Sequence, residues 1–388
     1  MTLDHVPCGF IPLTDSAVLV AAVEMGFAAA EGIALDLKRE ASWSNIRDRI
    51  AMGVYPVAHM LSPMAVSMSL GLGPLPVRID APFVMNQNGN VLTARAEIAA
   101  HLADLGATPR DPAATGAALR ALTRRSLLRI GVPFPHSMHL LLTRYLLEAS
   151  GADLSRVTFA VAPPPILPDM MRAGEVDAFM VGEPWGSLAV ERGDACILLP
   201  GQAIWAAAPE KVLGTRRDWI EDHPDVARRL LRAMHRAAKW CSDAGSASVL
   251  AEILAMPHYV NAPADLIQRG LDGQIVLNSQ GDLLTVPGFA RFGGGAVNFP
   301  WRSAGMWIAD QAAQAWGIPK RQAQTVAHDA FRSDLYRLAL AQLDPMLPAA
   351  SMKVEGSLQS ETLARAVSGE VPLGPDSFFD ARVFEFDA

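Results

Sequence analysis

The chain has 388 residues, which at roughly 150 residues per domain predicts two or three domains and excludes a small disulfide-stapled module. Apolar residues make up 51% of the chain and charged residues 19%, a composition typical of a compact globular protein and not of a disordered one. With 33 basic and 40 acidic side chains the net charge is −7, so we expect no direct binding to nucleic acid or to an anionic membrane surface.

The three cysteines, Cys8, Cys196 and Cys241, have no CxxC or Cys/His spacing, and we expect them to be reduced packing residues. The sequence predicts no metal and no cofactor. Met1 leads directly into a strand-like segment with no pattern typical of a signal peptide, which favours a cytoplasmic protein; a periplasmic location is the alternative if a leader was removed. The longest uncharged stretch, 54–77, is interrupted by prolines, so no membrane insertion is expected.

The first third of the chain predicts a β-α-β-α-β unit. Its strands are expected to start near residues 4, 33 and 55. Asp15 and Ser42 stand where the two intervening helices are expected to begin, because their short polar side chains can cap a helix.

An Ala-rich helical stretch at 95–125 leads into a second unit of the same kind. Its strands are expected to start near residues 127, 156 and 176, and Ser137 stands at a helix start. Because the strand spacing nearly repeats that of the first unit, we predict two similar α/β lobes with mainly parallel sheets. Such sheets bind ligands beyond the carboxyl ends of their strands.

From about Gly214 the pattern changes to long helices, followed by a polar tail. These helices are expected to pack on the first lobe, which requires the chain to cross back between the lobes near 199–211. We therefore predict an α/β, two-lobed protein with a hinge and C-terminal packing helices. Residues 1–88 and 206–388 form the first lobe, and residues 89–205 form the second.

Helix starts that face strand ends recur in both lobes, and such ends suit a small anion. Trp43, His139, Lys211 and the turn at 182–185 are expected at lobe-facing positions. Each also has a purely structural interpretation: packing for the tryptophan, a buried core histidine, a surface lysine and a tight turn. The glycine cluster at 292–295 lacks the flanking strand and helix of a phosphate-binding loop and is expected to be an ordinary loop.

Several motifs together resemble one family. The segments GFIPLTDSAVLVAA, EASWSNIRDRIAMG, DMMRAGEVDAFMVGEPW, PEKVLG and FFDARVFEF resemble, in order and spacing, the nitrate and bicarbonate solute-binding proteins of ABC transporters, including their cytoplasmic relative, the nitrate/nitrite sensor NasS. The resemblance covers nearly the whole chain. It implies a two-lobed, periplasmic-binding-protein-like (type II) fold that closes on an oxyanion, and it implies a binding protein and not an enzyme.

Carried over position by position, the resemblance implies ligand contacts by Trp43, Gly89, Asn90, His139, Gly182 and Lys211. A ring wall, amide donors, an imidazole N–H and one ammonium suit a planar oxyanion. Transporter members commonly have Gln where this chain has Asn90, and Gly-Thr where it has Ser137-Met138. These departures change the size of the site, so nitrate, nitrite and bicarbonate remain alternatives.

The missing leader and the resemblance together favour a cytoplasmic sensor. It would bind nitrate or nitrite and, by resemblance, control an RNA-binding antitermination regulator. The alternative is a solute-binding receptor of a nitrate/bicarbonate-type ABC transporter. A third class, an enzyme on the same fold such as the thiamine-pyrimidine synthesis relatives, is disfavoured because the sequence shows no clustered nucleophile, histidine or cysteine motif.

Overall fold

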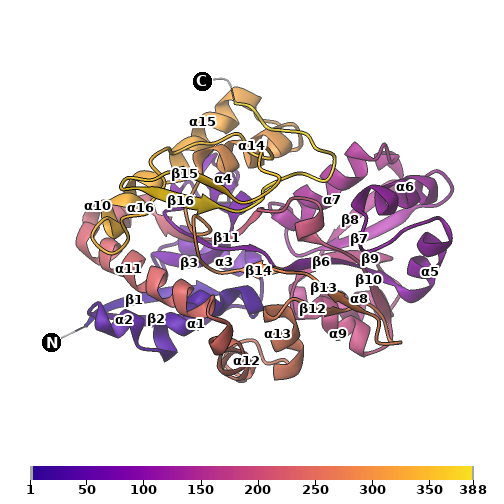
Figure 1. The fold of residues 1–388 in the computed structure, drawn as a ribbon, viewed down its shortest axis with the longest axis horizontal. Coiled ribbons are helices and arrows are strands. Elements are labelled where there is room, and N and C mark those ends of the chain that lie inside the picture. The colour runs from indigo at the N-terminus through magenta and orange to yellow at the C-terminus, as the bar shows by residue number, and fades with distance from the viewer. Residues whose placement is uncertain (1–2, 387–388) are drawn as a thin grey trace.

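The computed structural model describes residues 3–386 and places two sheets next to each other, each flanked by helices (Figure 1). The sheet of the first lobe has the strand order β14-β5-β11-β3-β1-β2, with β4 paired to β11. Its strands are β1 (Asp4–Phe10), β2 (Ile33–Arg39), β3 (Val57–Leu61), β4 (Ile79–Asp80), β5 (Val84–Asn88), β11 (Pro209–Arg216) and β14 (Ala290–Arg291).

The sheet of the second lobe has the order β10-β6-β9-β7-β8. Its strands are β6 (Asn90–Arg95), β7 (Leu128–Val132), β8 (Val157–Val161), β9 (Ala178–Gly182) and β10 (Ala195–Pro200). Two small hairpins complete the described strands, namely β12 (Gln274–Val276) with β13 (Leu283–Thr285) and β15 (Thr362–Arg365) with β16 (Glu370–Leu373).

The α/β fold class predicted from the sequence is confirmed, and each lobe contains a parallel three-stranded unit. In the first lobe β1 pairs in parallel with β2 and β3, and in the second β7 pairs in parallel with β8 and β9. The strands that carry the chain between lobes add antiparallel pairs, since β11 pairs with β3 and β5, and β6 pairs with β9 and β10. The sheets are therefore mixed, and not mainly parallel as expected.

Helices cover both sheets, and the C-terminal ones pack on the first lobe as expected (Figure 1). The helices around the first sheet are α1 (Ala17–Glu24), α2 (Phe27–Ala30), α3 (Trp43–Ala51), α4 (Ser62–Ser69), α10 (Arg217–Asp222), α11 (Pro224–Cys241), α12 (Ala247–Ala255), α13 (Ala264–Leu271), α14 (Arg302–Trp316), α15 (Lys320–Ala330) and α16 (Ser333–Leu340). Those around the second are α5 (Ala96–Asp104), α6 (Pro112–Thr123), α7 (Met138–Ala149), α8 (Leu167–Arg172) and α9 (Trp185–Glu191).

The helical stretch expected at 95–125 is interrupted and forms two helices, α5 and α6. The break has a local cause. Gly106 adopts φ +94°, a backbone conformation that ends the first helix. Asp111 then caps the second helix, because its carboxylate accepts hydrogen bonds from the N–H groups of Ala113 and Ala114 just after Pro112.

The chain passes from the first sheet to the second at Asn88-Gly89-Asn90. Asn88 and Gly89 adopt φ +59° and +86°, which turns the chain sharply between β5 and β6. It returns between β10 and β11, through residues 201–208. The two crossings lie close together, since Asn88 N–H donates to the Ala208 carbonyl across them at 3.0 Å.

The hairpin β12–β13 makes a further connection between the lobes. Ile275 and Leu284 of this hairpin form an apolar cluster with Val91, Val190 and Ile197 of the second lobe. The sequence pattern assigns all of residues 206–388 to the first lobe, whereas this part of the segment packs on the second.

The C-terminal segment, expected as a polar tail, is anchored by aromatic side chains. Phe378 is buried and stacks on Trp205 and Trp307, with ring centroids 4.9 Å and 5.5 Å away. Tyr145 of α7 donates a hydrogen bond of 2.9 Å to the Asp380 carboxylate. The segment thereby joins the second lobe to α14 of the first.

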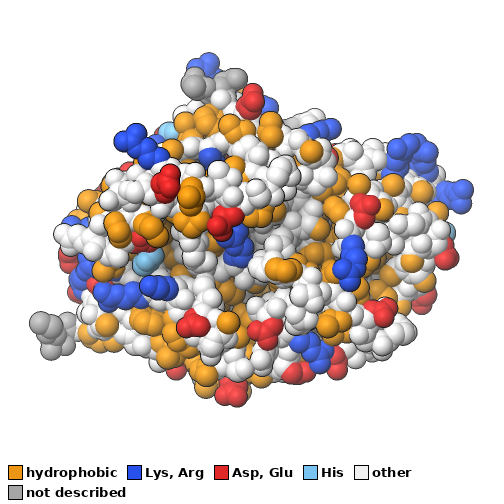
Figure 2. Space-filling model, viewed as in Figure 1, with side chains coloured by type: hydrophobic (Ala, Val, Ile, Leu, Met, Phe, Trp, Pro, Cys, Tyr) orange, Lys and Arg blue, Asp and Glu red, His pale blue; other side chains and the backbone are white. Residues whose placement is uncertain are grey.

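The visible molecular surface carries side chains of both charges, interspersed and with no large field of one sign (Figure 2). Between residues 3 and 386, no helix is both long and apolar enough to cross a membrane.

Candidate functional site

Side chains from both lobes meet in a buried ionic cluster at the crossings between the two sheets. Lys211 and Glu210 lie on β11, just after the chain returns to the first lobe, and both are fully buried. Asp15 follows the carboxyl end of β1, and His59 lies on β3. The ends of parallel strands thus supply part of the site, as the alternation of strands and helices predicts.

The Lys211 ammonium is at the centre of this cluster. Its Nζ donates to Asp15 Oδ2 at 2.6 Å and to Glu210 Oε1 at 2.9 Å, and it lies 5.6 Å from the ring centroid of Trp43. Burial acts to lower the pKa of Lys211, but the two carboxylates outweigh it and hold the pKa above its ordinary value. The lysine is therefore a permanent buried cation.

Asp15 connects Lys211 to His59. His59 Nε2 lies 3.0 Å from Asp15 Oδ1, while Ile11 N–H donates to His59 Nδ1 at 3.5 Å. Because Nδ1 accepts from Ile11, a neutral His59 carries its proton on Nε2. Neither Nε2 nor Asp15 Oδ1 has a well-formed hydrogen bond to a residue between 3 and 386. Burial acts to raise the pKa of Asp15, but Lys211 and His59 overcome it and the pKa lies well below its usual range; burial lowers the pKa of His59.

Glu210 connects the same lysine to the second lobe. Its Oε2 accepts a hydrogen bond of 2.6 Å from the Asn90 amide, and Oε1 accepts from Lys211. Both oxygens accept, which is the arrangement of an ionised carboxylate. Burial nevertheless raises the pKa of Glu210 above its ordinary value.

His139 approaches from α7, where Ser137 caps the helix by accepting from Leu140 N–H as expected. Its Nδ1 lies 3.4 Å from Glu210 Oε1, and neither ring nitrogen has a well-formed hydrogen bond to any residue between 3 and 386. Burial, followed by the charge of Lys211, lowers the pKa of His139 well below its ordinary value. A buried imidazole that lacks such a bond is costly unless a ligand supplies one.

Trp43 is placed by the cap of α3, where Ser42 accepts from Asn45 N–H as expected. The indole is buried beside His59, with ring centroids 5.4 Å apart. Its Nε1, like His59 Nε2, is a further buried nitrogen that has no hydrogen-bond partner among the described residues. The site thus offers indole and imidazole N–H groups next to an ammonium.

Gly182 and Gly89 contribute through their lack of side chains. Gly182 ends β9 directly opposite Asn90, and a Cβ on it would lie 3.2 Å from Asp15 Oδ2. The Gly89 carbonyl accepts a hydrogen bond from Glu183 N–H, which links the turn at Gly89 to the end of β9.

The structure therefore brings Trp43, Asn90, His139, Gly182 and Lys211 together and places Gly89 at the adjoining turn. Contact of these residues with a ligand stays a prediction. Sequence reasoning missed Asp15, His59 and Glu210 as members of the cluster. The sequence predicts Asp15 as a helix start suited to a small anion, whereas its side chain forms no cap and accepts a hydrogen bond from Lys211.

Glu183 is another buried carboxyl group, just outside the cluster. Its Oε2 accepts from Ser187 N–H at 3.2 Å, and its backbone carbonyl accepts from Thr14 N–H of the first lobe. Burial raises its pKa to about 7, although the Ser187 hydrogen bonds oppose the change. The carboxyl group of Glu183 is therefore protonated over part of the physiological pH range.

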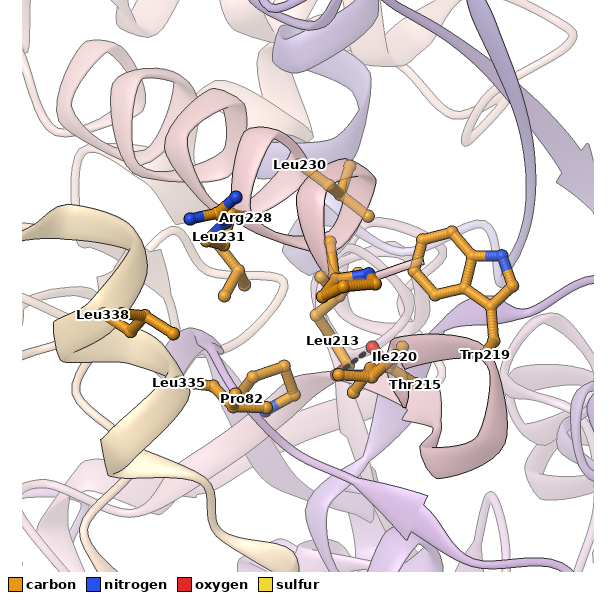
Figure 3. Close-up of a pocket in the computed structure, with 12 residues that line it drawn as sticks. Pro82, Leu213, Thr215, Trp219, Ile220, Arg228, Leu230, Leu231, Leu335 and Leu338 are labelled. Atoms are coloured by element: carbon orange, nitrogen blue, oxygen red, sulfur yellow. Dashed lines mark hydrogen bonds between the residues drawn. The ribbon is translucent and has the colours of Figure 1, made fainter. Parts of the chain in front are cut away.

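An apolar cavity of about 300 Å³ lies elsewhere in the first lobe (Figure 3). Leu230 and Leu231 of α11 face Leu335 and Leu338 of α16 across it, and Leu213 of β11 forms part of its wall. It offers few polar groups, in contrast to the ionic cluster two residues earlier on the same strand. In the part of the chain that the structure describes, no group of three or more His, Cys, Asp or Glu side chains is arranged to hold a metal ion.

Two α/β lobes joined by crossing strands, with polar groups buried between them, define the fold of two-lobed solute-binding proteins. The crystal structure of the periplasmic nitrate-binding protein NrtA from Synechocystis superimposes with a TM-score of 0.85 and 23% identity, covering 99% of this chain and 96% of that one. The alkanesulfonate-binding protein SsuA from Xanthomonas axonopodis pv. citri gives a TM-score of 0.60 at 14% identity, over 84% of this chain and 98% of that one. The predicted fold is confirmed by these likenesses.

The chain belongs to the NMT1-like family, whose profile matches residues 3–255. The nitrate/nitrite binding protein NrtA of Nostoc sp. is 31% identical over 360 residues, covering 89% of this chain and 79% of that protein. The nitrate import ATP-binding protein NrtC of Synechocystis sp. is 32% identical over 344 residues, covering 86% of this chain. This chain spans 50% of the length of that relative. The bicarbonate-binding protein CmpA of Synechococcus sp. is 26% identical over 398 residues, covering 95% of this chain and 84% of that protein.

Proposed function

We propose that this protein binds a small monovalent oxyanion of the nitrate type between its lobes and serves as the solute-binding receptor of an ABC transporter. The observation that carries the proposal is the state of His139. This imidazole is fully buried beside Lys211 and Glu210, yet within residues 3–386 neither of its nitrogens has a well-formed hydrogen bond. An oxygen of a bound anion would satisfy its N–H.

Nitrate suits the chemistry of this site. It is planar and carries only acceptors, while Trp43, His139 and Lys211 carry donors. Gly182 has no Cβ, which allows the side chains of Asp15 and Leu13 to pack closely against its backbone. The names of the NrtA relatives support nitrate or nitrite, and the name of CmpA supports bicarbonate as the alternative ligand.

The role as a receptor rests on the relatives, which are named as binding proteins and as components of import systems. The NrtA structure is described as periplasmic, which supports a periplasmic location for this chain and a non-catalytic role. The sequence by itself favours a cytoplasmic sensor of nitrate or nitrite that controls an antitermination regulator. That interpretation uses the same site and differs in the partner, and the relatives named above give it no support.

Isothermal titration calorimetry with nitrate, nitrite and bicarbonate in turn tests the ligand. We expect His139→Ala and Lys211→Ala each to weaken binding by about 1.5 to 3 kcal/mol, the range for charge-assisted hydrogen bonds. The exposed Lys38 provides the matched control, and Lys38→Ala should bind as the wild type does. Unchanged affinity in both site variants would reject the site.

The role is tested separately. The purified protein is mixed with the cognate membrane components and, in a parallel sample, with an antitermination regulator. Nitrate-dependent stimulation of the transporter ATPase supports the receptor. A complex with the regulator that dissociates when nitrate or nitrite is added supports the sensor instead.

A further inference from the structure

The buried cluster contains more negative than positive charge. Asp15 and Glu210 both contact Lys211, and all three side chains are at most 3% exposed. Burial and neighbouring charges hold His59 and His139 in their neutral forms. With both carboxylates ionised, two negative charges therefore surround one positive charge in a space that water does not reach.

A monovalent anion placed against this cluster adds a further negative charge. Electrostatic repulsion is strong in a buried site, because little solvent screens it. Lys211 cannot offset the ligand by itself, since its ammonium already donates to both carboxylates. A proton on the protein or on the ligand would restore the balance of charge.

Geometry identifies where the protein can accept that proton. Glu210 Oε1 and His139 Nδ1 lie 3.4 Å apart, and each comes from a different lobe. A proton shared by this pair would form the hydrogen bond that the two groups now lack, and it would leave the imidazole Nε2 free to donate to a ligand. The Asp15–His59 pair also lacks a well-formed hydrogen bond among the described residues. It is the poorer acceptor, because Asp15 holds the shorter contact to Lys211 and His59 Nδ1 already accepts from Ile11 N–H.

We propose that an oxyanion with no proton of its own, such as nitrate, binds this cluster together with a proton, which the Glu210–His139 pair takes up. This proposal deepens the proposed function and rests on it. Anion affinity should then fall as pH rises, by up to about tenfold for each pH unit, because a binding reaction that consumes a proton loses affinity in that proportion. The proton belongs to the pair and not to one residue, because the two groups titrate together.

The other ionisable groups near the pair can be distinguished from it. Asp15 faces it from the turn after β1, His59 from β3 and Lys211 from β11, and all three belong to the same buried cluster. Glu183 lies at the end of β9, where its carboxyl group contacts Ser187 and not Lys211 or His139. On the loop before α7, His136 lies near Arg47, whose guanidinium packs over Phe134.

The test is isothermal titration calorimetry of sodium nitrate into the full chain, at slightly alkaline pH, in phosphate and in Tris buffer. These buffers differ in ionisation enthalpy, so proton uptake appears as a difference between the two observed binding enthalpies. We expect wild-type protein to take up about one proton per nitrate, with affinity falling as the pH is raised.

Glu210→Gln is the decisive variant, because it removes one negative charge and keeps the shape of the side chain. Asn90 Nδ2 donates to Glu210 Oε2 in the wild type. If the glutamine places its NH2 group at that position, a turned Asn90 amide can accept from it through Oδ1. We expect this variant to bind nitrate with equal enthalpy in both buffers and with little dependence on pH. Glu183→Gln makes the same substitution at the neighbouring buried carboxyl group and should keep the proton uptake.

Failure of this inference differs from failure of the proposed function. Absence of any nitrate binding in the wild type contradicts the function itself. Binding with equal enthalpy in both buffers leaves the function intact and overturns the proton uptake. Uptake that persists in Glu210→Gln and disappears in Glu183→Gln also overturns it, because the proton would then reside outside the Glu210–His139 pair.

Discussion

Lys211 and Asp15 are 196 positions apart in the chain, yet Lys211 Nζ lies 2.6 Å from Asp15 Oδ2 in a fully buried ion pair. Asp15 follows the first strand of the first lobe, and Lys211 lies on the strand by which the chain returns from the second. The contact therefore forms only when the chain has completed its passage through both lobes. Folding of the first lobe and assembly of the site are coupled through this ion pair.

Replacing Lys211 by methionine should destabilise the protein strongly. Lys211→Met keeps much of the side-chain volume but leaves Asp15 and Glu210 buried without a counter-charge, which typically costs about 3 to 5 kcal/mol. Urea denaturation measures the loss. The control is Lys38→Met, because this lysine pairs with Asp36 at the surface and is 50% exposed. It should change the free energy of unfolding by less than about 0.5 kcal/mol, and equal losses in the two variants would contradict the role given to the buried pair.

A methyl group at Gly182 should disturb the site directly. Its Cβ would lie 3.2 Å from Asp15 Oδ2, so the carboxylate must shift by a few tenths of an ångström, and 3.4 Å from Leu13 Cδ2, which is a close contact. We expect Gly182→Ala to lower stability by about 1 to 3 kcal/mol, as overpacking does, and to weaken nitrate binding. Gly73→Ala is the control, because the nearest neighbours of its Cβ would lie at 3.6 Å and 3.9 Å. Calorimetry that finds the two variants equal in nitrate affinity would refute this prediction.

Glu183 should make stability depend on pH in a defined window. Its pKa is raised from 4.5 to about 7 in the folded protein, so the unfolded chain releases the proton first as pH rises. Stability is therefore lost between about pH 4.5 and 7, and it stays lower above that range. Removing the ionisable group by Glu183→Gln should stabilise the protein by about 1 to 3 kcal/mol at alkaline pH and have little effect at acidic pH.

Urea denaturation at a series of pH values tests this expectation. Glu97→Gln serves as the control, because Glu97 is 80% exposed and pairs with Arg95 at the surface. A difference between wild type and Glu183→Gln that stays constant across the pH range would show that the carboxyl group does not ionise in this window.

The hydrogen bond from Tyr145 to Asp380 should favour the arrangement in which the lobes are in contact. Tyr145→Phe removes it and should lower stability by about 1 kcal/mol. Because the bond joins α7 of the second lobe to the C-terminal segment, nitrate affinity should fall as well. Tyr259→Phe removes a comparable hydrogen bond to Glu24 within the first lobe. That control should lose stability and keep its nitrate affinity, as calorimetry and denaturation together can show.

Much of the fold is predictable from the sequence because its parallel units consist of apolar strands and capped helices. The strands near residues 33 and 157 and the caps at Ser42 and Ser137 have clear local signals. The crossing strands have none. The segment NQNGN around Gly89 is polar, yet it is buried where β5 and β6 meet, so hydrogen bonds between distant strands, and not local pattern, decide its structure.

The same distinction between local sequence pattern and long-range contacts explains which residues of the site are predictable. Trp43, Asn90, His139, Gly182 and Lys211 were proposed from motifs and resemblance, and the structure places them together. His59 was missed because a single histidine in the apolar segment VAHML has the pattern of a core strand. The sequence does not indicate Glu210, because neighbouring side chains in a strand normally point to opposite faces of the sheet. In the structure, Glu210 and Lys211 both reach the cluster. They lie at an irregularity in the pairing of β11 with β5.

The sharp turn at Asn88-Gly89 has a mechanical consequence. Asn90, which binds Glu210, lies one residue beyond Gly89, so the cluster is located at the fulcrum between the lobes and not at their outer edges. A small rotation at such a point displaces the distant ends of both lobes by much more than it displaces the cluster itself. Slight adjustments around the anion would therefore be amplified at the distant surfaces of both lobes, where a partner protein could detect occupancy without touching the ligand.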